Sequence, residues 1–167
     1  DGINITLKRI VVAVDPTKSD EPGDECGIVV AGLGEDGHAY VMADESVKGS
    51  PYVWASKALS ARNTYRADRL IYEKNRLGQA ENTMKAVDPS AKWDEVHATE
   101  GKQTRADPVP ALYEHGRVHH VGRFPLLEDE MTTWDPKSKH SPNRMDALVW
   151  AITDLLLGEI RAPLIAR

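Results

Sequence analysis

The sequence predicts an α/β protein with a mixed central β-sheet, whose first three strands are antiparallel, flanked by helices on both faces. Three observations lead to this prediction. Three apolar, valine-rich runs occupy the first 45 residues, helix-like and strand-like patterns alternate after residue 50, and a long amphipathic helix closes the chain. This order is typical of a layered fold, because each helix must bury its apolar side against the sheet.

The three opening strands are marked by apolar runs and by the turns between them. Leu7–Asp15 is apolar on both faces and is closed by Pro16, as expected for a buried central strand. Cys26–Leu33 and Ala39–Glu45 are two further strand-like runs. The segment Gly34–Gly37 between them has the composition of a hairpin turn, so the three strands are predicted to form an antiparallel meander.

Helices and short strands alternate over the next eighty residues. Ser50 followed by Pro51 predicts a helix start, because serine favours the N-cap and proline the first helical position. The expected elements are a helix over 51–67, a strand over 69–73, a helix over 78–88, a strand over 96–98, a helix over 102–115 interrupted by two prolines, an extended piece over 117–121 and a helix over 126–131.

The last element has the clearest pattern. Ser141 and Pro142 predict its start and Gly158 its end. Its apolar positions recur at the spacing of one helix face. They are Met145, Leu148, Val149, Ile152, Leu155 and Leu156. With residues 1–6 and 159–167 expected to be tails, we predict one domain with its core over 7–157, which suits a chain of 167 residues.

Composition excludes several classes of protein. With 41% hydrophobic and 28% charged residues, the chain has the mixture of a globular domain and not of a disordered one. No apolar run approaches the roughly 20 residues that span a bilayer, so we expect no membrane association. The single cysteine, Cys26, rules out an internal disulfide, fits a reducing compartment and is expected to be a small buried apolar side chain.

The net charge of −5 excludes binding of nucleic acid by bulk positive charge. A contact with DNA or RNA therefore needs a local basic patch, a divalent metal or a neighbouring domain. The same acidic excess is also expected of a carboxylate site for cations, or simply of a solvated surface.

Two patterns that often mark binding sites do not predict one here. Gly32–Gly37 satisfies G-x-G-x-x-G, but a strand follows it where a phosphate-binding loop needs a helix N-terminus. The six histidines lack metal-ligand spacing, and the adjacent His119 and His120 should point to opposite faces of an extended segment. We expect a hairpin in the first case and ordinary histidines in the second.

Three carboxylates lie at the ends of predicted strands or at the start of a predicted helix. Asp15 ends the first strand, Glu73 ends the strand over 69–73, and Asp146 lies in the first turn of the last helix, at the edge of its apolar stripe. If the two strands are neighbours and the helix packs on them, the three acids meet at one end of the sheet. Carboxylates so close repel one another, and hard cations such as Mg²⁺ or Mn²⁺ would neutralise them.

Two of the acids also have a simpler explanation. Asp15 precedes Pro16 and could serve a turn. Asp146 could stabilise the helix dipole, a contribution of about 0.3–1 kcal/mol. The three positions taken together favour the metal site.

Six short motifs occur in the order of a known family. They are VVAVDP (11–16), YEKN (72–75), KQTRADP (102–108), GRV (116–118), LEDEM (127–131) and SPNRMDAL (141–148). This succession resembles the C-terminal nuclease domain of the large terminase subunit of tailed bacteriophages, over roughly residues 7–157. The resemblance implies an RNase H-like fold, shared with RuvC-type resolvases and retroviral-type integrases. It also implies that Asp15, Glu73 and Asp146 are the catalytic, metal-binding acids.

The resemblance carries a full set of functional expectations. It implies a metal-dependent endodeoxyribonuclease that cuts concatemeric viral DNA during packaging, using two divalent ions, Mg²⁺ or Mn²⁺, and leaving 5′-phosphate and 3′-hydroxyl ends. The expected partners are double-stranded DNA, the packaging ATPase domain of the same subunit, which nothing in this chain matches, the small terminase subunit and the portal. The expected location is the cytoplasm of the infected bacterium.

Several basic residues are candidates for a DNA track. Lys102 and Arg105 are three apart on one side of a predicted helix, and Lys74 and Arg144 flank the acids. Phosphate contacts do not read sequence, so we expect little sequence preference. The alternative for each cation is a solvated surface position.

Other acids near the motifs are assigned simpler roles. The acidic run over 128–130 is expected to be a solvated helix face, and Asp24 a loop residue or an accessory ligand. At the level of the whole domain, the alternatives are a Holliday-junction resolvase, an RNase H-type nuclease, or a catalytically inactive module that docks on DNA or on the portal.

Overall fold

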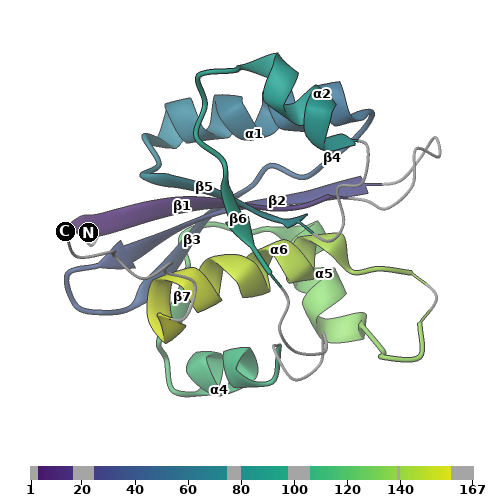
Figure 1. Cartoon of the computed structure of the whole chain (residues 1–167). Helices are drawn as coiled ribbons and strands as arrows, with labels where there is room; N and C mark the ends of the chain where they lie inside the picture. Colours follow the sequence, from purple (N-terminus) through teal and green to yellow (C-terminus); the bar gives the residue numbers. More distant parts are fainter. Residues whose placement is uncertain (1–3, 17–24, 75–79, 98–105, 139, 159–167) are drawn as a thin grey trace.

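A mixed sheet forms the centre of the protein in the computed structural model, which describes residues 4–16, 25–74, 80–97, 106–138 and 140–158. The strand order is β6-β5-β1-β2-β3-β7, and the short β4 pairs with β2 (Figure 1). The strands are β1 (Leu7–Asp15), β2 (Glu25–Gly34), β3 (Ala39–Asp44), β4 (Val47–Lys48), β5 (Arg69–Glu73), β6 (Asp94–Val96) and β7 (Val118–His120). β1, β2 and β3 are antiparallel, as predicted, whereas β5, β6 and β7 join in parallel.

Helices cover both faces of the sheet (Figure 1). α1 (Pro51–Tyr65) and α2 (Ala80–Val87) lie on one face. α4 (Pro108–Glu114), α5 (Pro125–Thr133) and α6 (Asn143–Ile152) lie on the other, and a π-helical turn, η2 (Thr153–Leu157), continues α6. The predicted fold class is therefore confirmed. None of the helices in the described ranges is both long and apolar enough to cross a bilayer.

β1 is buried on both faces, as its continuous apolar run predicted. Val11 and Ala13 belong to the core beneath α6, whereas Val12 and Val14 belong to the core beneath α1. Successive side chains of a strand point to opposite faces of the sheet. The face on which any other residue of β1 lies therefore follows from its distance in sequence from these four. Cys26 is buried in the α1 core, where burial raises the pKa of its thiol, and it is the small apolar side chain that we expected.

Most element boundaries follow the sequence pattern, and the differences have local causes. β5 has its predicted bounds, and α1 ends two residues early, at Tyr65. The helix predicted over 102–115 is α4, and it begins at Pro108, because prolines are tolerated only in a first turn, where no N–H is needed. The strand predicted over 96–98 is β6, shifted toward Asp94, and β4 was not predicted. Residues 102–105 lie outside the described residues.

The glycine-rich segment after β2 is a hairpin, as predicted. Gly37 has φ 80°, a left-handed conformation that favours glycine, and its N–H donates to the carbonyl of Gly34 at 3.0 Å. The side chain of Asp36 accepts the N–H of His38 at 3.0 Å. β3 follows directly, so no helix N-terminus is available for a phosphate.

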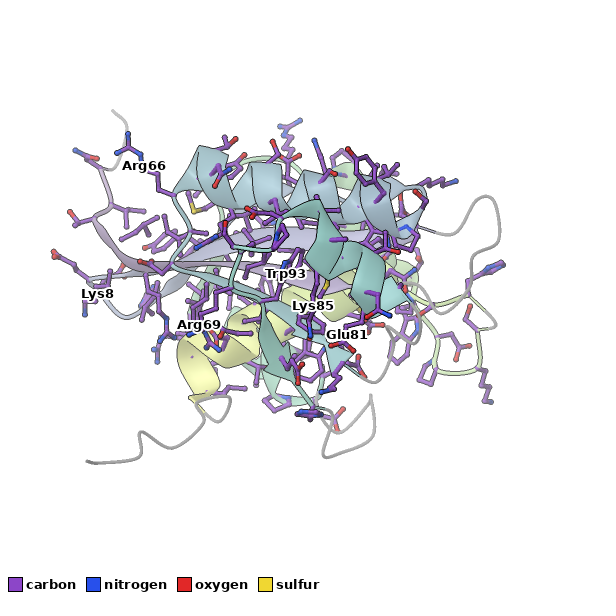
Figure 2. The ribbon with its side chains drawn as sticks, turned by 45° about the horizontal axis from the view of Figure 1, so that its top comes forward. Lys8, Arg66, Arg69, Glu81, Lys85 and Trp93 are labelled. Atoms are coloured by element: carbon purple, nitrogen blue, oxygen red, sulfur yellow. The ribbon has the colours of Figure 1, made fainter. Side chains whose placement is uncertain are left out.

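An ion-pair network fastens η2 to the start of β5. Arg69, labelled in Figure 2, pairs with Asp154 and, through Nε at 3.1 Å, with Asp94 on β6. Arg9 donates to the carbonyl oxygen of Asp154 at 2.6 Å. Arg69 lies at the opposite end of β5 from Glu73, four residues or about 13 Å along the strand, whereas Asp94 is in register with Ile71.

Candidate active site

Asp15 and Glu73 lie at matching ends of two neighbouring strands. β1 and β5 are parallel, and Val14 pairs with Tyr72, so the next residue of each strand is one of the two acids. By the alternation along each strand, both acids point to the α6 face, like Ala13 and Ile71. Both are buried, with Asp15 0% and Glu73 6% exposed.

α6 brings Asp146 toward the same end of the sheet. Gly27 on β2 pairs with Asp15, and the first turn of α6 lies directly on Gly27. A Cβ atom at Gly27 would collide with the carbonyl oxygen of Asn143 and lie 3.0 Å from the backbone nitrogen of Arg144. Only glycine allows so close an approach. Asp146 follows in this first turn and is 4% exposed.

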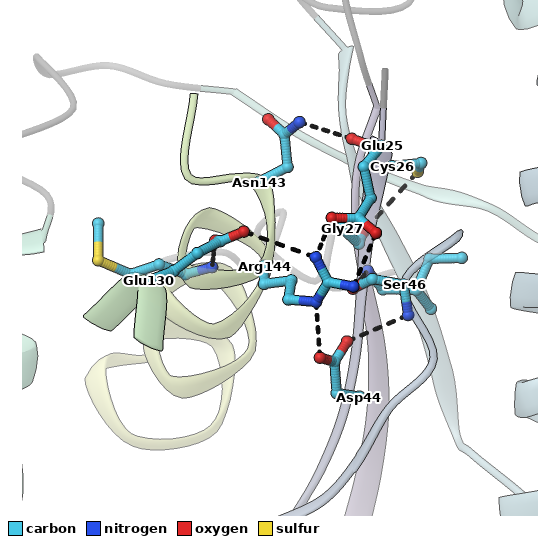
Figure 3. Close-up of polar contacts among 10 residues, drawn as sticks. Glu25, Cys26, Gly27, Asp44, Ser46, Glu130, Asn143 and Arg144 are labelled. Atoms are coloured by element: carbon cyan, nitrogen blue, oxygen red, sulfur yellow. Dashed lines mark hydrogen bonds and ion pairs between the residues drawn. The ribbon is translucent and has the colours of Figure 1, made fainter. Parts of the chain in front are cut away.

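Arg144 lies in a cluster of carboxylates and not on an open surface (Figure 3). Its side chain is 8% exposed. Its guanidinium forms a two-pronged pair with Glu25 of β2, and its Nε donates to Asp44 of β3 at 2.8 Å. Glu130 of α5 lies 3.7 Å from its Nη1. Arg144 therefore has partners within the protein, and its burial differs from the open position that a phosphate contact requires.

Glu130 corrects the prediction that the acidic run over 128–130 is a solvated face. Glu130 is half-buried and accepts the backbone N–H of Met145 at 3.0 Å. Burial raises the pKa of this carboxyl, and the nearby Asp44 and Asp146 carboxylates shift it the same way. Glu128 is also engaged, because it accepts the N–H of Phe124 at 3.2 Å and pairs with a histidine of β7. The prediction was wrong for Glu130, since a helix face that looks polar in sequence can meet a second helix, whereas Glu128 remains exposed.

Lys74 is an exposed cation beside the acids. It follows Glu73 directly, and its Nζ donates to Glu95 of β6 at 2.8 Å. The same carboxylate accepts the hydroxyl of Tyr72 at 2.9 Å and so fixes the position of the lysine. Lys102, Arg105 and Asp24 lie outside the described residues.

The two histidines of β7 lie away from the acids, because β2 and β3 separate β7 from β1. His119 stacks on Tyr40 and lies 2.8 Å from a ring nitrogen of His38. His120 contacts the hydroxyl of Tyr113 at 2.7 Å on the α4 and α5 side. The two neighbours point to opposite faces, as predicted.

The three acids supply the donors that hard cations prefer. Oxygen ligands suit Mg²⁺ and Mn²⁺, and Asp15, Glu73 and Asp146 offer carboxylates on one face of the sheet. Within the described ranges, however, no group of three His, Cys, Asp or Glu side chains is arranged so that it could hold a metal ion. The three carboxylates are therefore the right type of ligand for a hard cation. Their side chains would have to change position in order to bind one together.

Two residues at the site, Gly27 and Glu25, were not predicted from the sequence. Gly27 interrupts an apolar strand, and a glycine inside a strand is itself a signal of close backbone approach. Glu25 lies just outside the strand predicted over Cys26–Leu33 and is the first residue of β2. Nothing local in the sequence marks it as the partner of an arginine 119 residues away.

The sequence matches one family model, and the fold is similar to that of several solved structures. The family model described as "Terminase RNaseH-like domain" matches residues 12–155. The large terminase nuclease from the thermophilic phage G20c superposes with a TM-score of 0.69 at 11% identity, covering 87% of this chain and 81% of that chain. No curated protein matches the sequence.

Two further solved structures are similar in fold. The large terminase of bacteriophage HK97 gives a TM-score of 0.65 at 14% identity, over 91% of this chain and 40% of that chain. The human cytomegalovirus terminase nuclease domain, Mn soaked and inhibitor bound, gives 0.60 at 12% identity, over 84% of this chain and 81% of that one. At these identities the likeness concerns the fold.

Proposed function

The chain belongs to the family of terminase RNase H-like domains, and from this we propose that it is a metal-dependent endonuclease that cuts concatemeric viral DNA during phage genome packaging. The observation that carries the proposal is the register of β1 and β5, in which Asp15 and Glu73 are neighbours on the face that α6 covers. The first turn of α6, which contains Asp146, lies on the β2 residue that pairs with Asp15.

The three acids are the residues that would hold two divalent cations, Mg²⁺ or Mn²⁺. When bound, such ions activate a water molecule and stabilise the charge that develops on the phosphate. The contribution of the chain is to bury Asp15, Glu73 and Asp146, which excludes competing solvent. It also carries them on two strands and a helix, and such elements hold a site more firmly than loops do.

The proposed substrate is double-stranded DNA, read with little sequence preference. Lys74, at the edge of the sheet beside Glu73, and the basic pair Lys102 and Arg105 would contact the phosphates, which position a duplex without reading its bases. The proposed partners are the packaging ATPase domain of the same subunit, the small terminase subunit and the portal, in the cytoplasm of the infected host.

A substrate comparison tests this function. With Mn²⁺, the protein should nick and linearise a supercoiled plasmid, and EDTA should abolish the reaction. Linear duplex DNA should be cut faster than a four-way junction or an RNA–DNA hybrid of the same length. Faster cutting of the junction would instead identify a resolvase, and faster cutting of the hybrid an RNase H-type enzyme. DNA binding without cleavage in either Mg²⁺ or Mn²⁺ would identify an inactive docking module.

Lys74→Ala should weaken binding to duplex DNA without unfolding the protein. Removing one phosphate contact should lower the slope of log K against log salt by about 0.9. The pair with Glu95 is half-exposed and screened by solvent, so its loss should change stability little. Fluorescence anisotropy over a salt series measures the slope. Lys57→Ala is the matched control, because Lys57 of α1 is about as exposed as Lys74 and also pairs with a glutamate, Glu45 at 2.7 Å, but lies on the face of the sheet opposite the three acids and should leave the slope unchanged. An unchanged slope for Lys74→Ala would contradict the prediction.

A further inference from the structure

The first turn of α6 carries Asp146, yet its own sequence anchors it weakly. The N-cap position is Pro142, which makes no side-chain capping hydrogen bond. Helix starts leave backbone N–H groups without partners inside the helix, and a side-chain acceptor normally supplies one. Here the acceptor comes from another helix, since Glu130 of α5 accepts the N–H of Met145 at 3.0 Å.

Arg144, in the same turn, ties this helix start to the sheet. The two-pronged pair with Glu25 reaches the first residue of β2, and the 2.8 Å bond from Nε reaches Asp44, the last residue of β3 (Figure 3). The neighbouring Asn143 donates its side-chain amide to the carbonyl oxygen of Glu25 at 2.5 Å. A planar guanidinium in a buried two-pronged pair fixes orientation as well as distance.

The geometry points to Arg144 as a positioning residue of the site: through Glu25, Asp44 and Glu130 it sets the place of Asp146 opposite Asp15. This inference rests on the proposed function only where metal binding is concerned, because the placement itself exists without metal. Asp146 lies two residues after Arg144, so a rotation or shift of the first turn moves its carboxylate directly.

Small displacements matter at such a site. A ligand or catalytic group has to be held within about 0.5 Å of its productive position, and neighbouring groups that orient the ligands supply that precision. Loss of one such group typically costs about 10–100-fold in metal affinity or activity. Arg144→Lys keeps the charge but removes the planar fork, so it separates orientation from charge.

The test compares Arg144→Lys with Arg69→Lys. Arg69 is also a part-buried arginine with two carboxylate partners, Asp94 and Asp154, but it lies at the opposite end of β5. For both variants and the parent protein, crystal structures without metal give the distance between the Asp15 and Asp146 carboxylates. Calorimetry with Mn²⁺ alone gives the dissociation constant, and thermal melting gives the stability. Glu25→Gln, which keeps one oxygen acceptor, is the milder variant if Arg144→Lys does not fold.

We expect both arginine variants to melt at a lower temperature, and only Arg144→Lys to move Asp146 and to raise the Mn²⁺ dissociation constant by about 10–100-fold. An unmoved Asp146 in Arg144→Lys and in Glu25→Gln would overturn the inference, and so would an equal effect of Arg69→Lys on Mn²⁺ binding. If Asp146 moves but the parent protein neither binds Mn²⁺ nor cuts DNA, the positioning role stands and the proposed function fails.

Discussion

Replacing Asp146 with asparagine should abolish DNA cleavage in Mn²⁺ while leaving the fold intact. The amide has nearly the size of the carboxylate but carries no charge, so it is a poor ligand for a hard cation. Metal ligation supplies several kcal/mol of transition-state stabilisation, and a loss of about 4 kcal/mol lowers the rate about a thousandfold. The measurement is the initial rate of plasmid nicking, together with a thermal melt to verify folding.

Asp94→Asn provides the control for this result. Asp94 is an acid of the same sheet that is in register with Ile71 and is already neutralised by Arg69 and Lys92, so its variant should cut at the parental rate. Asp15→Asn and Glu73→Gln should lose cleavage as Asp146→Asn does. A parental rate for Asp146→Asn would remove Asp146 from the proposed metal site, and a parental rate for all three would refute the site.

The fold was predictable where local pattern decides structure. The run Leu7–Asp15 is apolar at every position from Ile10 to Val14, and a strand buried on both faces follows from that alone. The position of β5 was equally clear, because residues 70–72 form a short apolar run between Arg69 and Glu73. Less was predictable where the structure of a segment depends on a neighbour, as for the two-residue β4, which pairs with β2.

The part of the site that lies at the strand ends was predictable from the sequence. The acids at the ends of β1 and β5 can be found from the sequence, since parallel neighbours end at one edge of a sheet. The surroundings of Arg144 could not be found in this way. Its carboxylate partners on β2 and β3 are 119 and 100 residues distant, and an arginine beside an acidic motif looks the same in sequence whether it contacts DNA or a buried carboxylate.

Gly27→Ala should lower both stability and the rate of cleavage, because the backbone at the start of α6 occupies the space that the added methyl group needs. The added Cβ would meet backbone atoms of Asn143 and Arg144, which cannot rotate away as a side chain can. Overpacking of this kind costs about 1–3 kcal/mol of unfolding free energy. The displacement of α6 also moves Asp146 relative to Asp15, the residue paired with Gly27, so the folded fraction should cut DNA slowly.

Urea unfolding and plasmid nicking at equal folded concentration separate these two effects. Gly122→Ala is the matched control: its Cβ would lie 3.5 Å from the ring of Phe124, an ordinary contact, and both measurements should stay at parental values. If Gly27→Ala lowers stability but the folded protein cuts at the parental rate, then the position of α6 on β2 does not set the reactive geometry. If instead both fall together only for Gly27, the close approach of α6 to β2 is a requirement of the chemistry and not only of packing.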